Sequence, residues 1–141
     1  RGPFEQVLAQ HSPETRDRIC LLGAVDEATK RDLLAATDML AMASRTESFG
    51  ITYLEAWLYG KPVIGARFWG IDDVIADGED GLLVPFGDVV ALVEAIARLL
   101  SDPAEAAAMG QRGQDKVYAK HTWDQKYAVT RDVYEALAQS G

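Results

Sequence analysis

The chain has 141 residues, the size of one domain, and its content of 48% hydrophobic and 26% charged residues argues against disorder. Its 22 acidic and 14 basic residues give a formal net charge of -8, which speaks against nucleic acid or an anionic membrane as the main partner. No apolar run reaches the ~18 residues that a membrane span needs.

The first segment with helical character covers residues 4–10, and no strand precedes it. A helix that packs on a sheet needs that preceding strand, so we expect the chain to begin inside a domain that is truncated at its N-terminus. The short apolar run at residues 18–22 predicts the first strand. Its Cys20 is the single cysteine of the chain, and we expect a buried small hydrophobe rather than a reactive thiol.

Further short apolar runs follow at residues 39–42, 62–66 and 81–84. Runs this short, apolar on both faces, are typical of strands buried in a parallel sheet. Helical patterns lie between them at residues 26–36, with Asp26 as the N-cap, at 50–59 and at 71–76. This order predicts an α/β fold in which a Rossmann-like parallel sheet is flanked by helices, with residues 1–141 as a single domain.

Beyond Pro85 the pattern is wholly helical, which predicts a helical C-terminal tail. Three caps indicate where its helices begin: Asp88, then Asp102 followed by Pro103, and finally Thr122 in a capping box that opens a helix to about residue 138. Two glycines inside the second helix predict close packing or a break, and three aromatic residues at apolar helical positions are expected in the core. The glycines are Gly110 and Gly113; the aromatic residues are Trp57, Trp123 and Tyr134.

The segment from Glu47 to Glu55 follows a predicted strand and opens a helix. Ligands of open α/β sheets bind at the carboxyl ends of the strands, where the N–H groups and the positive dipole end of a helix favour an anion. Gly50 lets a phosphate approach the backbone closely, and the Thr52 hydroxyl can donate a hydrogen bond. The segment therefore predicts a site for a phosphate-bearing ligand.

Helical geometry places two carboxylates around that phosphate. Ile51, Leu54 and Leu58 recur at i, i+3 and i+7, which predicts that they face the sheet. Glu55 lies on the neighbouring stripe, about 6 Å beyond the helix start, where it can accept hydrogen bonds from both hydroxyls of a ribose. Glu47 precedes the helix and lies on the other side of the bound anion. It is positioned to contact the group attached to the distal phosphate of the ligand, such as a sugar hydroxyl. Either glutamate alone is more typical of a helix-dipole partner or a surface residue; the pair at this spacing favours a function.

Residues 47–56 resemble the Glu-x7-Glu motif of the family 4 (group 1) retaining glycosyltransferases. The similarity continues, in the family's order, at residues 18–25, 36–38, 60–66, 77–85 and 121–124, and it covers the chain from about residue 2 to its end. The resemblance implies the C-terminal, nucleotide-sugar-binding half of a GT-B enzyme.

The resemblance also implies roles for individual residues. Glu55 would hold the ribose, and Glu47, the candidate catalytic residue, would contact the transferred sugar and stabilise the charge that develops on it. The remaining donor-binding residues would lie against the diphosphate, the sugar and the base. They are Ser48, Phe49, Gly50, Ile51, Thr52 and, near the base, Val25. No metal and no other cofactor is implied, because the nucleoside diphosphate sugar is the substrate.

The sequence departs from the family in one loop, where the usual Gly-Gly-x-Pro-Glu is replaced by Trp69-Gly70-Ile71-Asp72-Asp73. The family's diphosphate-binding Arg and Lys and its acceptor-binding N-terminal domain come from segments upstream of Arg1. We therefore expect the chain alone to be inactive and to bind donor weakly, because each lost charge-assisted contact costs about 1.5–3 kcal/mol. The missing N-terminal domain would hold the acceptor, which could be a sugar, a lipid or another molecule. We expect the full-length enzyme to be cytoplasmic, and peripheral attachment to a membrane stays open.

Other signals are assigned no binding role. The acidic residues between 72 and 80 have turn spacing and fit no calcium loop, and Lys61 is expected in a surface turn. His11 and His121 are too far apart to suggest zinc, and we expect an exposed His121. Two alternatives stay open: a GT-B sugar-nucleotide epimerase or phosphorylase relative, and a non-catalytic nucleotide-binding module.

Overall fold

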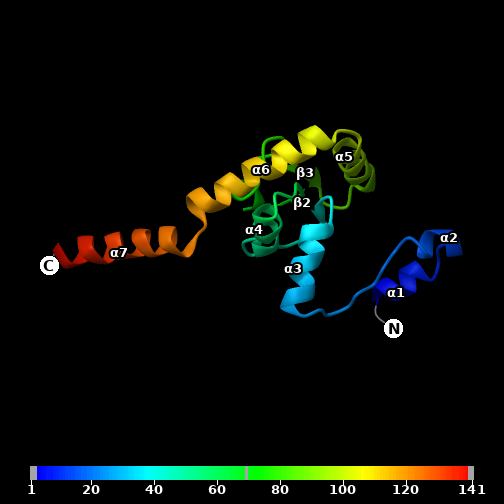
Figure 1. The fold of residues 1–141 in the computed structure, drawn as a ribbon, viewed down its shortest axis with the longest axis horizontal. Helices are drawn as coiled ribbons and strands as arrows, with labels where there is room; N and C mark the ends of the chain where they lie inside the picture. The colour runs from blue at the N-terminus through cyan, green and yellow to red at the C-terminus, as the bar shows by residue number, and fades with distance from the viewer. Residues whose placement is uncertain (1–2, 69, 140–141) are drawn as a thin grey trace. The chain divides into compact units, whose positions relative to one another are not determined.

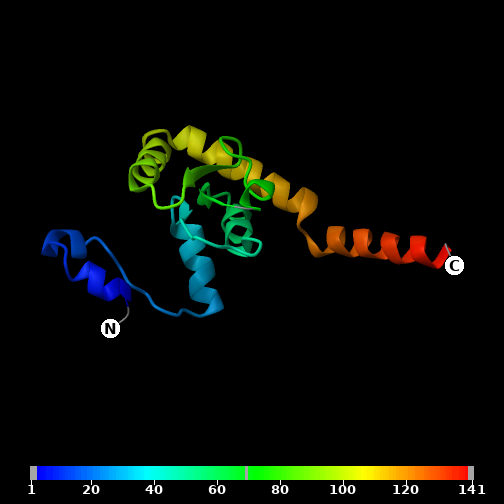
Figure 2. The ribbon, with the colours of Figure 1, turned by 180° about the vertical axis from the view of Figure 1, so that it is seen from behind.

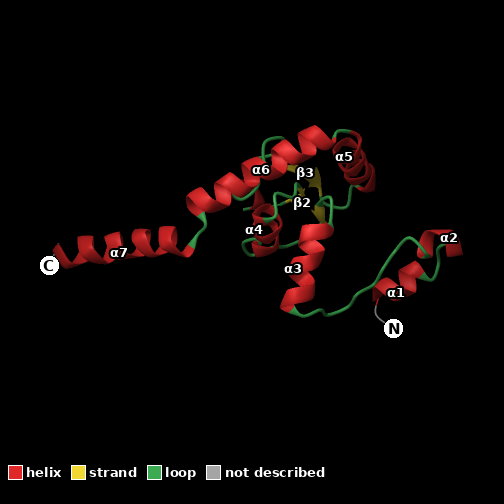
Figure 3. Ribbon diagram, viewed as in Figure 1, coloured by secondary structure: helices red, strands yellow, loops and turns green. Residues whose placement is uncertain are grey.

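The computed structural model describes residues 3–68 and 70–139, which belong to two compact units, Arg1–Lys30 and Arg31–Gly141. In its described residues the second unit contains a parallel sheet of three strands in the order β1-β2-β3 (Figures 1 and 3). The strands are β1 (Leu40–Met42), β2 (Val63–Arg67) and β3 (Gly81–Pro85). Leu40 pairs with Val63, and Val63 pairs with Gly81, so the carboxyl ends of all three strands meet at one edge.

Helices cover both faces of this sheet, as Figures 1 and 2 show from opposite sides. Successive strand residues point to opposite faces, so Val63 packs with Tyr53 and Trp57 of α4 (Ile51–Leu58), whereas Ile64 packs with α5 (Val89–Ser101). The helix α6 (Pro103–Lys120) contributes to both clusters. The predicted α/β fold with a parallel sheet flanked by helices is confirmed.

The two glycines of α6 allow this helix to approach its neighbours closely. A Cβ atom at Gly110 would lie 1.9 Å from the carbonyl oxygen of Gly60, and one at Gly113 would lie 2.1 Å from Cδ1 of Trp57. No side chain larger than hydrogen fits at such distances without movement. The prediction of close packing at Gly110 and Gly113 is therefore confirmed.

The predicted N-caps are also confirmed. Asp26 accepts a hydrogen bond from Thr29 N (2.7 Å) at the start of α3 (Glu27–Ala36). Asp88 and Asp102 accept equivalent bonds from N–H groups of α5 and α6, at 3.0 and 2.9 Å. Thr122 Oγ1 accepts a bond from Gln125 N (3.4 Å) where α7 (Trp123–Gln139) begins.

The N-terminal unit differs from the prediction at residues 18–22, which are described and form no strand. Ser12 caps the short helix α2 (Pro13–Arg16), and the turn that follows uses the backbone of Arg18 and Ile19, whose N–H groups donate to Thr15 and Arg16. A strand needs a neighbour for its backbone groups, and these bonds stay local instead. Cys20 is exposed, so the prediction of a buried thiol is wrong. The unit's other helix is α1 (Pro3–Leu8).

Aromatic residues of the C-terminal helix differ from the prediction as well. Trp57 of α4 is fully buried, but Trp123 and Tyr134 of α7 are 90% and 70% exposed. None of the described residues of α7 is buried. An apolar stripe on a helix becomes buried only where another element packs against it. Within residues 3–68 and 70–139, no helix combines the length and the apolar character that crossing a membrane requires.

Candidate functional site

The loop after β1 ends in a glycine that starts α4. Gly50 is the N-cap of α4 at φ 81°, in the left-handed region that glycine adopts without strain. Gly50 has no side chain with which to cap α4, whereas the side chains of Asp88 and Asp102 cap α5 and α6. The first N–H groups of α4 and its positive dipole end therefore favour an anionic ligand.

A buried tyrosine fixes the start of α4 to the end of β1. The hydroxyl of Tyr53 donates a hydrogen bond to the carbonyl oxygen of Met42, at 2.8 Å. Burial, and to a smaller extent the charge of Glu47, raises the pKa of Tyr53 to about 12, so this hydroxyl keeps its proton at neutral pH. The first turn of α4 is thereby held at the carboxyl edge of the sheet.

The buried face of α4 is not the predicted one. Tyr53, Ala56 and Trp57 are buried, whereas Ile51 and Leu58 are exposed, Ile51 by 64%. The stripe shifts because both aromatic side chains have fixed polar partners: the Trp57 indole donates to the carbonyl oxygen of Asp80 at 2.9 Å, as the Tyr53 hydroxyl does to that of Met42. The expectation that Ile51 and Leu58 face the sheet is therefore wrong, whereas Leu54 is partly buried and packs against the core.

A cavity of about 390 Å³ lies at the carboxyl ends of β1 and β2. One wall follows β1 and the other follows β2. The lining residues are Thr46, Glu47, Ser48 and Phe49 from the first loop, and Phe68, Gly70 and Ile71 from the second. The cavity therefore lies where open α/β sheets bind their ligands, and three of the predicted site residues line it.

The remaining candidates lie around the cavity or in the other unit. Gly50, Ile51 and Thr52 form the N-cap and first turn of α4, directly after the lining residue Phe49. Glu55 is half-buried one turn further along α4 and is absent from the described lining. Val25 belongs to the N-terminal unit, where it is exposed.

The carboxylate of Glu47 is partly organised by its own loop. Its Oε1 atom accepts a hydrogen bond from the backbone N–H of Ser48, at 3.0 Å. The residue is half-buried and lines the cavity. Glu47 thus presents a carboxylate with spare acceptor positions to a ligand in the cavity.

The wall that follows β2 comes from residues that the sequence prediction did not assign to the site. Phe68, Gly70 and Ile71 flank Trp69, which lies outside the described residues. A signal for them existed, because the loop after the second parallel strand opens at the same sheet edge as the loop after the first. The loop in which this sequence departs from the family therefore contributes Gly70 and Ile71 to the cavity wall.

The acidic residues between 72 and 80 support this wall. Arg67 at the end of β2 forms ion pairs with Asp72 at 2.6 Å and with Asp77 at 2.5 Å. Asp72 belongs to the 3-10 turn η1 (Ile71–Asp73). The described residues contain no group of three or more His, Cys, Asp or Glu side chains that could hold a metal ion.

A buried ion pair anchors the same segment to α6. The Lys116 ammonium contacts Asp80 Oδ2 at 2.5 Å and the carbonyl oxygen of Val74 at 2.6 Å, and it lies 5.2 Å from the ring centroid of Trp57. The other oxygen of Asp80 accepts from the N–H of Ala76 at 2.9 Å. The chain between η1 and β3 is thus fixed by charge as well as by packing.

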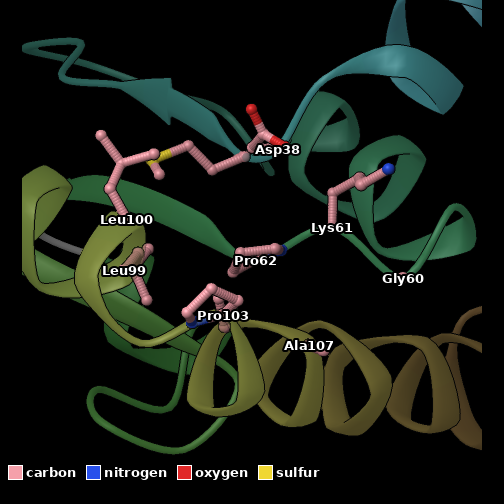
Figure 4. Close-up of a pocket in the computed structure, with 10 residues that line it drawn as sticks. Asp38, Gly60, Lys61, Pro62, Leu99, Leu100, Pro103 and Ala107 are labelled. Carbon is pink, nitrogen blue, oxygen red and sulfur yellow. The ribbon is translucent and has the colours of Figure 1, made fainter.

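A second cavity, of about 340 Å³, lies at the opposite edge of the sheet (Figure 4). Met39 and Pro62, which directly precede β1 and β2, line it together with Leu99 and Pro103 of α5 and α6. Amino ends of parallel strands are not where open α/β sheets bind ligands. The cavity beside Glu47 is therefore the better candidate for the functional site.

Comparison with known proteins identifies the family to which this chain belongs. The sequence model of the family described as "Glycosyl transferases group 1" matches residues 5–116. N-acetyl-alpha-D-glucosaminyl L-malate synthase of Bacillus anthracis is 38% identical over 102 residues, covering 72% of this chain and 26% of that protein.

Two solved structures are similar in fold over nearly the whole chain. Sucrose-phosphate synthase from Thermosynechococcus elongatus matches 98% of this chain and 34% of its own length, with 30% identity and a TM-score of 0.86. Anabaena HepE, solved in complex with UDP-glucose, matches 98% of this chain and 38% of its own, with 26% identity and a TM-score of 0.76.

The chain belongs to the group 1 glycosyltransferases, and its fold is that of the C-terminal half of a GT-B enzyme. It spans 26% of the N-acetyl-alpha-D-glucosaminyl L-malate synthase and 34% of sucrose-phosphate synthase.

Proposed function

We propose that this chain is the donor-binding domain of a retaining glycosyltransferase that takes a sugar from a nucleoside diphosphate. The observation that carries the proposal is the cavity lined by Glu47, Ser48 and Phe49 beside an α4 N-terminus with no described side-chain cap. Membership in the group 1 glycosyltransferases and the UDP-glucose bound by HepE support it.

In this proposal the diphosphate lies at the start of α4. The N–H groups of Ile51 and Thr52 face the phosphate oxygens, and the helix dipole stabilises the negative charge that grows when the sugar leaves. Gly50 is required at this turn, because its φ is 81° and a Cβ there would lie 2.5 Å from Cδ2 of Tyr53. These groups favour the leaving diphosphate more strongly in the transition state than in the bound donor.

The two glutamates act on the two ends of the donor. Glu47 lines the cavity, where its carboxylate stabilises the positive charge that develops on the sugar as the bond to phosphate breaks. Glu55, one turn into α4, accepts hydrogen bonds from the ribose hydroxyls. Both roles depend on the side chains' positions on either side of the helix start.

The acceptor would bind to another part of the enzyme. We propose that an N-terminal domain of the same protein holds it, whether it is a sugar, a lipid or another molecule. The exposed apolar side chains of α7 offer a surface for that domain, and burying them would cover Trp123, Tyr127 and Tyr134.

Two substitutions in the full-length enzyme test the proposal. Glu55→Gln should weaken nucleoside diphosphate binding about 10- to 100-fold, because hydrogen bonds to a charged group contribute roughly 1.5–3 kcal/mol. Glu47→Gln should lower kcat by at least about 10-fold while changing nucleotide affinity little. Titration calorimetry with UDP, GDP and ADP measures the first effect, and steady-state kinetics measures the second.

Glu94→Gln is the matched control, because Glu94 is exposed on α5, away from the cavity lining. Unchanged nucleotide affinity in Glu55→Gln removes Glu55 from the site. A normal kcat in Glu47→Gln refutes the role given to Glu47, and failure of all three nucleotides to bind the unmodified enzyme refutes the donor site itself.

A further inference from the structure

Phe49 contributes an aromatic wall to the cavity at the carboxyl edge of the sheet, and this ring has one described aromatic neighbour. The ring of His121 packs against it with a centroid distance of 5.8 Å and an interplanar angle of 62°. This is the edge-to-face arrangement that aromatic pairs prefer. The side chain of Phe49 is otherwise 43% exposed, so this contact restricts a ring that solvent would leave free to turn.

His121 is itself held by a well-anchored helix. It is the C-cap of α6, and its N–H donates to the carbonyl oxygen of Val117 at 2.8 Å. The same helix is fixed by the close approach of Gly113 to Trp57 and by the ion pair of Lys116. The position of the His121 ring is therefore set by the scaffold and not by the loop that carries Phe49.

The environment of the histidine is costly for a polar ring. Its Nδ1 atom is buried and has no hydrogen-bond partner among the described residues. Burial lowers the pKa of His121, and the charges of Lys126, Lys116 and Lys120 act in the same direction. An unpartnered buried nitrogen is unfavourable for stability, so the ring is held at this place by packing and not by a hydrogen bond from Nδ1 to the described residues.

We propose that His121 is a positioning residue, whose ring holds Phe49 in the orientation that completes the wall of the donor cavity. The inference rests on the proposed function, since it assigns a role to Phe49 in donor binding. It adds a residue more than 70 positions away from the Glu47 loop, at the junction of α6 and α7. His121 acts on donor affinity and leaves the chemical step to Glu47.

The test is a double-mutant cycle in the full-length enzyme, with UDP-glucose as the donor probe if UDP is the nucleotide bound. His121→Ala should raise the donor KM roughly 2- to 10-fold, the range expected for one aromatic pair, with kcat unchanged. His121→Phe should restore the KM because it keeps the ring. His121→Ala added to Phe49→Ala should change the KM no further. The matched control is His11→Ala at an exposed histidine.

The outcomes separate the inference from the proposed function. An unchanged donor KM in Phe49→Ala contradicts the donor cavity. A raised KM in Phe49→Ala with an unchanged KM in His121→Ala overturns the inference alone. It is also overturned if His121→Phe behaves like His121→Ala, or if the effects of His121→Ala and Phe49→Ala multiply, because the histidine then acts by another route.

Discussion

Replacing Lys116 by methionine tests the ion pair that fixes the segment between η1 and β3. The side chains of Lys116 and Asp80 are only 18% and 7% exposed, and the ammonium also donates to the carbonyl oxygen of Val74. Methionine keeps a long apolar stem but removes the charge and both hydrogen bonds. Asp80 is then left as a buried carboxylate with a single described donor, the N–H of Ala76.

Breaking a buried pair by removing one partner costs about 3–5 kcal/mol. We expect the lower end for Lys116→Met, about 3 kcal/mol of unfolding free energy, because Asp80 keeps its bond from Ala76. Adding Asp80→Asn removes the stranded charge while the amide oxygen can still accept from Ala76. The double variant should therefore be more stable than Lys116→Met by about 2 kcal/mol.

Urea unfolding followed by circular dichroism measures these differences, with the m-value checking that the transition is unchanged. Lys120→Met is the control, because Lys120 is exposed in the last turn of the same helix, and it should change stability by no more than ~0.5 kcal/mol. A Lys116→Met variant within about 1 kcal/mol of the parent protein refutes the reasoning. A double variant less stable than Lys116→Met refutes it as well.

Two further predictions concern Tyr53 and Trp57, the buried aromatic residues of α4. The raised pKa of Tyr53, about 12, means that the folded state resists ionisation that the unfolded chain undergoes near pH 10, so stability falls as pH rises between these values. Thermal unfolding of Tyr53→Phe should depend less on pH from 9 to 11 than that of the parent, and an identical dependence contradicts the assignment. Gly113→Ala should lower the unfolding free energy by about 1–3 kcal/mol despite alanine's better helix propensity, because the new methyl group meets the buried Trp57 ring. Ala108→Gly, at an exposed position of the same helix, reports propensity alone in parallel urea titrations, and a Gly113→Ala variant as stable as the parent contradicts the close packing.

Local sequence rules were sufficient for the three strands of the second unit and for most helix ends, although the strand predicted at residues 18–22 does not form. Short apolar runs gave the three strands of the second unit, and aspartates such as Asp88 and Asp102 marked helix starts because a cap acts through the next few backbone N–H groups. The carboxyl-edge rule then placed Glu47 and Phe49 beside a cavity. These inferences depend on neighbours in the chain or on the general geometry of parallel sheets.

The errors come from interactions between distant residues. The apolar stripe Ile51, Leu54 and Leu58 is a good amphipathic pattern, but hydrogen bonds from Tyr53 and Trp57 to other elements decide which face of α4 is buried. His121 was expected to be exposed because it precedes a cap. It is half-buried against Phe49, a contact between residues more than 70 positions apart that no local pattern encodes.

The ion pairs from Arg67 to Asp72 and Asp77 join residues on either side of the wall residues Phe68, Gly70 and Ile71. The paired residues themselves lie outside the segment that forms the cavity wall. Ile71 is buried in the core and Gly70 has a φ of 89° that favours glycine. Under the proposed function, Phe68 is therefore the position of this wall where a substitution can change sugar preference with the least effect on the backbone and the core.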